Sequence, residues 1–242
     1  MKTPAPLLIL SGILLAWSTA LAGPTKEVFE RPSKETLRLD YLLSLPEGYD
    51  ANGDRKWPLV VFLHGAGERG SDLDLVAKHG PPKRGAEGES FPFILVSPQC
   101  PENGWWPEQP VLELIDFLEE TYHVDPARIY LTGLSMGGYG TWHFASRAPK
   151  RFAAVAPVCG GGVPYLVRSL AHTPVWAFHG AKDTVVPLEE SARLIEVIQK
   201  SGNQSARLTV YPEAAHDSWT ETYANPEFYE WLLSHSLPAA EN

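Results

Sequence analysis

Short apolar runs alternate with amphipathic segments along most of the chain, and this alternation predicts its architecture. Runs of four to eight apolar residues bounded by turn-forming residues are typical of buried strands. They occupy residues 57–63, 91–97, 128–131, 152–158, 173–178 and 207–211. Helical spacing of apolar positions appears at residues 111–122 and 188–198, and helices are also expected at 138–146 and 227–237. Strands alternating with helices predict an α/β fold: a mostly parallel central sheet with helices on both faces.

The remaining segments refine this architecture. Residues 27–29 and 36–43 nearly alternate between apolar and polar positions, which predicts an antiparallel hairpin at the edge of the sheet. We expect a short helix at 72–78 and a loop at 81–90. The segment 160–172 has room for one short helix, so no large cap domain is expected. No repeat, low-complexity linker or charge run marks a boundary, and one catalytic domain is expected over residues 23–242.

The first 22 residues have the composition of an export signal. Lys2 precedes an apolar run that ends in Ala20-Leu21-Ala22, a small-x-small pattern typical of cleavage after Ala22. The alternative is an uncleaved membrane anchor, for which the run is short. We therefore expect a secreted or periplasmic protein with signal peptide 1–22 and no stable membrane association after cleavage.

Charge and composition exclude several partners. The formal net charge is −9, and a chain beginning at Gly23 carries −10 because Lys2 is the one charged residue before it. This balance argues against nucleic acid and anionic membranes, both of which require basic surfaces. No spacing of His, Cys, Asp and Glu indicates a metal site, and no cofactor is expected. Cys100 and Cys159 could form a disulfide or remain free, but two other strands should separate their own strands.

A serine at the end of a predicted strand is the candidate nucleophile. Residues 128–131 lead into Gly133-Leu134-Ser135-Met136-Gly137, which opens a predicted helix. This strand, G-x-S-x-G and helix order is typical of a nucleophile elbow, although the short motif alone would also fit an ordinary tight turn.

Two later strand ends carry the other groups that a serine nucleophile needs. Asp183 follows the run 173–178, and His216 follows the run 207–211. A histidine can take the serine proton, and a carboxylate can orient that histidine. The backbone N–H groups of Met136 and Ala66 are the candidate oxyanion donors. His64 and His179, which precede glycines, are expected to brace loops, and Asp217 to lie in an exposed turn.

Four stretches, residues 62–70, 130–140, 178–183 and 216–219, resemble the α/β-hydrolase fold. The resemblance is to secreted esterases of the polyhydroxybutyrate depolymerase and feruloyl esterase group, which also includes predicted peptidases related to prolyl oligopeptidases. It implies a triad of Ser135, Asp183 and His216. The related dienelactone hydrolases carry cysteine at the elbow, so Ser135 departs from their pattern and argues against their activity.

The expected function is hydrolysis of carboxylic esters through an acyl-enzyme. The expected substrates are esters with short or medium acyl groups, or esters attached to a polymer. One alternative is a serine peptidase or amidase of the prolyl oligopeptidase type. Another is a catalytically silent binding protein, although candidates at all three triad positions count against it. Trp105 and Trp106 either form the floor of an acyl pocket or pack beneath a loop.

Overall fold

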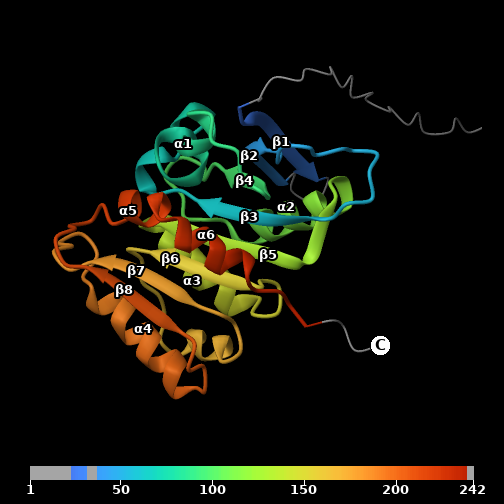
Figure 1. Cartoon of the computed structure of the whole chain (residues 1–242). Coiled ribbons are helices and arrows are strands. Elements are labelled where there is room, and N and C mark those ends of the chain that lie inside the picture. Colours follow the sequence, from blue (N-terminus) through green and yellow to red (C-terminus); the bar gives the residue numbers. More distant parts are fainter. Residues whose placement is uncertain (1–22, 32–36, 239–242) are drawn as a thin grey trace, which may run out of the picture.

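A computed structural model describes residues 23–31 and 37–238, so the predicted signal segment lies outside the described residues. An eight-stranded sheet with the order β1-β2-β4-β3-β5-β6-β7-β8 forms the centre of the molecule (Figure 1). β1 and β2 form the expected antiparallel hairpin, and β3 to β8 run parallel to one another. The strands are β1 Thr25–Arg31, β2 Leu37–Ser44, β3 Trp57–Leu63, β4 Ile94–Pro98, β5 Val124–Leu134, β6 Ala154–Val158, β7 Trp176–Gly180 and β8 Arg207–Tyr211.

The helices follow the expected pattern with two differences. They are α1 Gly80–Ala86, α2 Glu108–Thr121, α3 Met136–Arg147, α4 Glu189–Lys200, α5 Trp219–Ala224 and α6 Pro226–Leu233, with short 3₁₀ segments at η1 Ala66–Glu68, η2 Leu73–Lys78 and η3 Leu166–Leu170. The loop predicted at residues 81–90 is wrong, since α1 occupies its first half. Proline fits the first turn of a helix, where its missing N–H has no intrahelical partner, and Pro81 lies in that turn. Helix α5 was not predicted.

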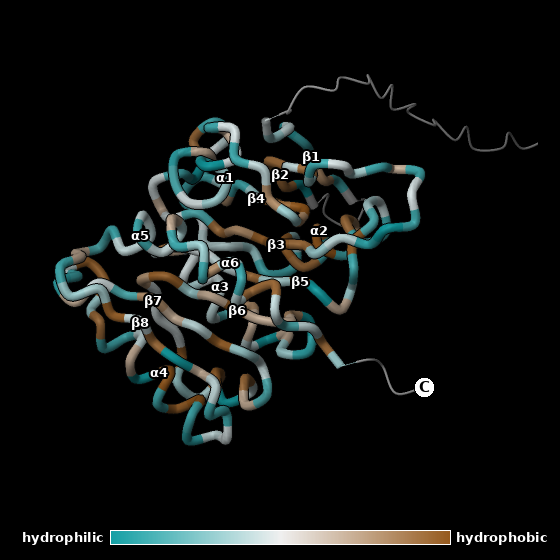
Figure 2. The backbone as a smooth tube through the Cα atoms, in the orientation of Figure 1, coloured by the Kyte–Doolittle hydropathy of each residue, from teal (hydrophilic) through white to brown (hydrophobic). Residues whose placement is uncertain are grey.

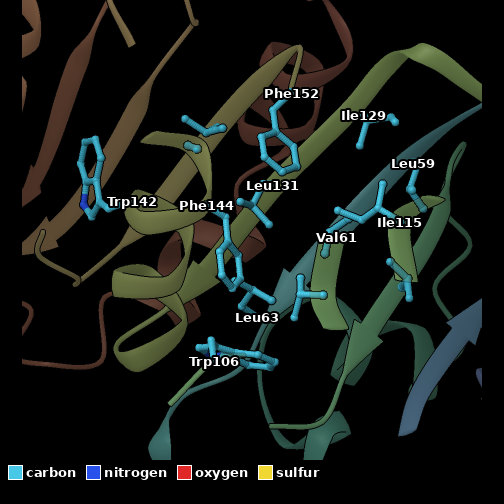
Figure 3. Close-up of a cluster of buried hydrophobic side chains, with 14 of the residues drawn as sticks. Leu59, Val61, Leu63, Trp106, Ile115, Ile129, Leu131, Trp142, Phe144 and Phe152 are labelled. Carbon is cyan, nitrogen blue, oxygen red and sulfur yellow. The ribbon is translucent and has the colours of Figure 1, made fainter. Parts of the chain in front are cut away.

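Two apolar layers hold the helices on opposite faces of the sheet. Along β3, Leu59, Val61 and Leu63 point into the core beneath α2, α3 and α4, whereas Val60 and Phe62 face the layer that receives α5 and α6. Figure 3 shows Leu63 and Leu131 beside Phe144 of α3 in the first layer. In Figure 2 the inner strands are mostly hydrophobic, in agreement with the apolar runs of the sequence.

The carboxyl ends of the parallel strands meet at one edge of the sheet. The loops after β3, β5, β7 and β8 therefore converge there, as is general for open α/β sheets. Between β6 and β7 the short segment η3 is the one helical element, as expected. Within the described part of the chain, no helix has the length and apolar character needed to cross a membrane.

Candidate active site

Ser135 lies in a strained turn between β5 and α3. Its φ of 52° and ψ of −115° fall in a region that L-residues rarely adopt. The turn is possible because its glycines allow close backbone contact: a β-carbon on Gly137 would lie 1.9 Å from the carbonyl oxygen of Leu63. One on Gly133 would lie 2.6 Å from the same oxygen. The glycines thus let α3 begin directly against β3 and place the serine at the edge of the sheet.

Asp183 is held in the loop after β7 by four polar contacts. Its Oδ1 accepts hydrogen bonds from the N–H groups of Val185 and Val186, both at 2.9 Å. Its Oδ2 lies 2.7 Å from Nδ1 of His216 and 3.3 Å from Nε2 of His179. Burial alone would raise the pKa of this carboxyl, but the hydrogen bonds from His216, Val186 and Val185 outweigh it and lower the pKa. The buried side chain is therefore a fixed carboxylate.

His216, in the loop after β8, connects this carboxylate to the serine. Its Nδ1 donates to Asp183, because the carboxylate can only accept, and its Nε2 lies 2.9 Å from Oγ of Ser135. In the neutral ring Nε2 is then an acceptor for the serine hydroxyl. The structure thus brings together the three side chains of the predicted triad in an arrangement that can move a proton from serine to imidazole.

The two backbone groups predicted as oxyanion donors both begin helical segments beside the serine. Met136 is the first residue of α3, and Ala66 is the first residue of η1. The N–H of a first helical residue has no acceptor within its own helix. Both groups therefore remain available for an oxygen outside the helix.

His64 braces the loop after β3, as predicted. Its Nε2 accepts a hydrogen bond from the backbone N–H of Cys100 at 2.9 Å, which leaves the proton on Nδ1, and Nδ1 donates to the carbonyl of Gly65 at 2.6 Å. Burial lowers the pKa of His64 to about 4, so the ring is neutral near pH 7.

His179 also braces a loop, and it contacts the candidate acid as well. Its Nε2 faces the carbonyl of Val186 at 2.9 Å and Oδ2 of Asp183 at 3.3 Å, and both of these oxygens are acceptors. Nε2 must therefore carry a proton. On the other side, Nδ1 lies 2.8 Å from Oγ of Ser191. The sequence predicted the brace but not the contact with Asp183, because loop spacing does not fix side-chain direction.

The two adjacent tryptophans have different environments. Trp106 is buried, donates from Nε1 to the carbonyl of His64 at 3.3 Å, and packs under the glycine-rich loop. Trp105 is 67% exposed and contacts the ring of Tyr139 edge-on. Both line a cavity of about 300 Å³ between α3 and the segment after β6. Trp106 thus packs beneath a loop, one of the two interpretations left open by the sequence, and the role of the pair in an acyl pocket stays a prediction.

The loop after β3 also contains a residue that the sequence analysis missed. Glu68 is 5% exposed, although a charged residue in a glycine-rich loop normally lies in solvent. A possible signal was the small residues Gly65, Ala66 and Gly67 before it, which leave room for a side chain to fold back.

The cysteines remain separate. Cys100 and Cys159 are free, buried thiols, and β3 and β5 lie between the strands that they follow, as expected. Burial raises the pKa of Cys159 to about 12. Across the residues that the structure covers, no group of three or more His, Cys, Asp or Glu side chains could hold a metal ion.

Comparison with known proteins shows that the chain is similar to esterases. The chain is 29% identical over 175 residues to a probable feruloyl esterase C from Aspergillus terreus, a match that covers 69% of this chain and 63% of the relative. It is 29% identical over 140 residues to a bifunctional acetylxylan esterase/xylanase from Neocallimastix patriciarum, covering 55% of this chain and 20% of that protein. The matches thus span less than two thirds of these relatives.

A solved structure and a family assignment agree with these matches. The crystal structure of a thermostable esterase is similar with a TM-score of 0.75 and 36% identity, over 88% of this chain and 63% of that one. The sheet order and this neighbour confirm the α/β-hydrolase fold. One family model matches residues 105–229, which are just over half of the chain. This range includes Ser135, Asp183 and His216. The chain belongs to the dienelactone hydrolase family.

Proposed function

We propose that this protein is an exported serine hydrolase that cleaves carboxylic esters. The observation that carries the proposal is the continuous hydrogen-bonded series from Oγ of Ser135 through His216 to the buried carboxylate of Asp183, with distances of 2.9 and 2.7 Å. A hydroxyl becomes an effective nucleophile when a base removes its proton during attack, and this series supplies that base.

In the first half of the reaction, Oγ of Ser135 attacks the ester carbonyl carbon while Nε2 of His216 takes the hydroxyl proton. Asp183 stabilises the imidazolium that forms. Negative charge collects on the former carbonyl oxygen, and the N–H groups of Met136 and Ala66 stabilise it. When the tetrahedral intermediate collapses, the ester C–O bond breaks and His216 returns the proton to the leaving alcohol.

The second half releases the acyl group. A water molecule takes the place of the alcohol, gives a proton to His216 as its oxygen attacks the acyl carbon, and forms a second tetrahedral intermediate. Collapse returns the proton to Oγ of Ser135 and frees the carboxylic acid.

The substrates proposed are esters with short or medium acyl groups, including esters attached to a polymer. The names of the relatives, feruloyl esterase and acetylxylan esterase, support this class. The cavity lined by Trp105, Trp106 and Tyr139 is the proposed acyl pocket. Tyr139 lies in the first turn of α3, where its N–H donates to the carbonyl of Ser135, and the aromatic walls of the cavity suit an apolar group. Hydrolysis of peptides at the same site is the alternative, and the relative kcat/KM values for a short ester and an oligopeptide distinguish the two.

The site is tested by Ser135→Ala. We expect kcat on a short ester to fall roughly 10³-fold or more, and labelling by a fluorophosphonate to disappear, because the nucleophile is lost. Circular dichroism should show an unchanged fold. Ser234→Ala, which changes an exposed serine directly after α6, is the matched control and should retain both activity and labelling. If Ser135→Ala kept a tenth of the wild-type activity, the elbow assignment would be wrong; an unlabelled, inactive wild type would support a binding protein.

A further inference from the structure

The carboxylate oxygen that holds His216 is also in contact with a second histidine. Oδ2 of Asp183 lies 2.7 Å from Nδ1 of His216 and 3.3 Å from Nε2 of His179. The side chains of Asp183 and His179 are both 0% exposed, whereas that of His216 is 20% exposed. Water therefore does not screen the contact between His179 and the carboxylate, and a polar group at this place acts strongly on Asp183.

The ring of His179 is fixed through both of its nitrogens. Nε2 lies 2.9 Å from the carbonyl oxygen of Val186, in the loop that follows Asp183, and Nδ1 lies 2.8 Å from Oγ of Ser191 in α4. Oγ of Ser191 is in turn 3.0 Å from the carbonyl oxygen of Gly160. The ring cannot turn without breaking these buried contacts, so the N–H group at Nε2 stays beside Asp183.

This N–H group reduces the negative charge that Asp183 offers to His216. Nε2 of His179 carries a proton because both of its neighbours are acceptors, and the positive end of the N–H dipole therefore lies against Oδ2 of Asp183. The charge of the carboxylate is what stabilises the imidazolium form of His216. A second donor on the same oxygen makes that form less favourable. A proton on Nδ1 of His179 would act in the same direction, so the sign does not depend on the charge of this ring.

We propose that His179 is a positioning residue for the reaction, which acts through Asp183 and keeps His216 unprotonated to a lower pH. The proposal rests on the proposed serine hydrolase function, because it concerns the base of that reaction. It goes beyond bracing of the loop, for which the contact with Val186 alone would be sufficient. The base is then available in more acidic surroundings than it would be beside an unshared carboxylate.

The other titratable groups around Asp183 and His216 are the same in all the proteins to be compared. Tyr139 and Cys159 interact electrostatically with Asp183, but burial raises the pKa of each, that of Cys159 to about 12, so both are neutral near pH 7. The charged groups on the neighbouring loops and on α4 are the exposed Asp217 and two ion pairs, Lys182 with Glu213 and Glu190 with Arg193. A change caused by substitution of His179 can therefore be assigned to His179.

The pH profiles of the intact protein and its variants test the proposal. The readout is the midpoint of the rise with pH, measured both for kcat/KM on a short ester and for the rate of labelling by a fluorophosphonate. His179→Leu removes the N–H group at similar side-chain size, whereas His179→Gln keeps an amide N–H group at the position of Nε2. We expect the midpoint to lie about one pH unit higher in His179→Leu and to stay within about 0.3 unit of the wild type in His179→Gln.

Two further variants complete the comparison. The side chain of His179→Asn is shorter, and its amide reaches the position of Nδ1 but not Asp183. This variant should shift the midpoint as His179→Leu does, and it serves if His179→Leu does not fold. His172→Gln is the matched control, because His172 is an exposed histidine, and it should keep the wild-type midpoint.

A purely structural role of His179 predicts the opposite sign. If His179 only braced the loop, its loss would let Asp183 move away from His216, and the weaker contact would lower the midpoint. A lowered or unchanged midpoint in His179→Leu and His179→Asn would therefore overturn the proposal. An upward shift in His179→Gln equal to that in His179→Leu would also overturn it, because the N–H group would then not be the cause. Failure of the proposed function is distinguishable, since the wild type would then neither hydrolyse the ester nor react with the fluorophosphonate.

Discussion

His64 supports the glycine-rich loop and takes no part in the proposed reaction. Its two ring nitrogens are both occupied by backbone partners, and it is 1% exposed. A charged imidazole at this position would lose one of these contacts, since Nε2 could no longer accept the Cys100 N–H, and would be poorly hydrated. The neutral form is therefore part of the folded state, and folding should be linked to pH through this side chain.

The lowered pKa of His64 determines the direction in which stability changes with pH and the pH range over which it changes. Its pKa is lowered from 6.5 to about 4 by burial, so between these values the unfolded chain binds a proton here and the native chain does not. The stabilisation is complete above pH 6.5 and decreases as the pH falls toward 4, by up to about 3 kcal/mol. Urea unfolding of the wild type at pH 7.5 and 4.5 should show this loss. His64→Gln should show a smaller difference between the two pH values, whereas His172→Gln, at an exposed histidine, should behave as the wild type does.

Individual histidines show how far the sequence alone could go. The position of His216 beyond the last strand pointed to its place beside Ser135, and the glycines after His64 and His179 pointed to bracing roles. The burial of Glu68 could not be predicted in this way, because it depends on His64, His79 and Gly65 coming together from separate parts of the chain. Periodicity reports the environment of an element and carries no information on a single side chain in a loop.

At the scale of elements, the close approach of α3 to β3 determines where Ser135 lies relative to the loop after β3. At Gly137 the start of α3 approaches the backbone at the end of β3 so closely that an added β-carbon would lie 1.9 Å from the Leu63 carbonyl oxygen. The helix therefore cannot shift along the strand without moving Ser135 relative to the loop that carries Ala66. Stability and geometry of the site should respond together to any side chain placed in this contact.

Gly137→Ala tests this coupling. The added methyl would overlap the Leu63 carbonyl at 1.9 Å, so strand and helix must separate. We expect a loss of unfolding free energy of about 3 kcal/mol or more, together with slower fluorophosphonate labelling. Gly67→Ala is the stability control, because nothing lies within 4 Å of the added carbon there. Equal stability of the two variants in urea would contradict the proposed contact.

Helices and strands with a strong repeating pattern of apolar residues were predicted well. Short helices, which are recognised mainly by the residues at their ends, were not. The apolar stripe of α2 predicted an amphipathic helix on the sheet, and residues 207–211 coincide with β8. Helix α1 was missed because its two prolines, Pro81 and Pro82, and its two glycines are residues typical of loops. Proline is also common in the first turn of a helix, and the prediction did not take this into account. Helix α5 spans six residues, too few to show a periodic pattern.

At the scale of the whole molecule, the connection between β6 and β7 limits what can cover the site. It contains the five-residue segment η3, and Tyr165 and Val163 beside it are exposed. Enzymes that act at oil interfaces open an apolar lid, and this connection is too short to form one. The proposed site is therefore open, which suits soluble esters and esters on a polymer chain.

This openness predicts the order of substrates. We expect kcat/KM to be highest for an ester with a two-to-four-carbon acyl group, lower for a sixteen-carbon ester, and lowest for an oligopeptide. The long chain finds no extended apolar surface to cover it, and an amine leaves less readily than an alcohol. Rates should be compared below the solubility limit of the long ester. A faster reaction with the long ester or the oligopeptide would reject the substrate class even if Ser135 proved essential.

The order of the site residues along the chain has a consequence for biosynthesis. Ala66, Ser135 and Asp183 are synthesised well before His216. The segment after His216 packs against the sheet through Phe228 and Leu232. The N–H of Leu237 also donates a hydrogen bond to the carbonyl of Ala127. A growing chain would thus carry the nucleophile and the acid for some time without the base. A fluorophosphonate would then label only chains whose synthesis is complete. Truncated products of translation that lack His216 would remain unlabelled.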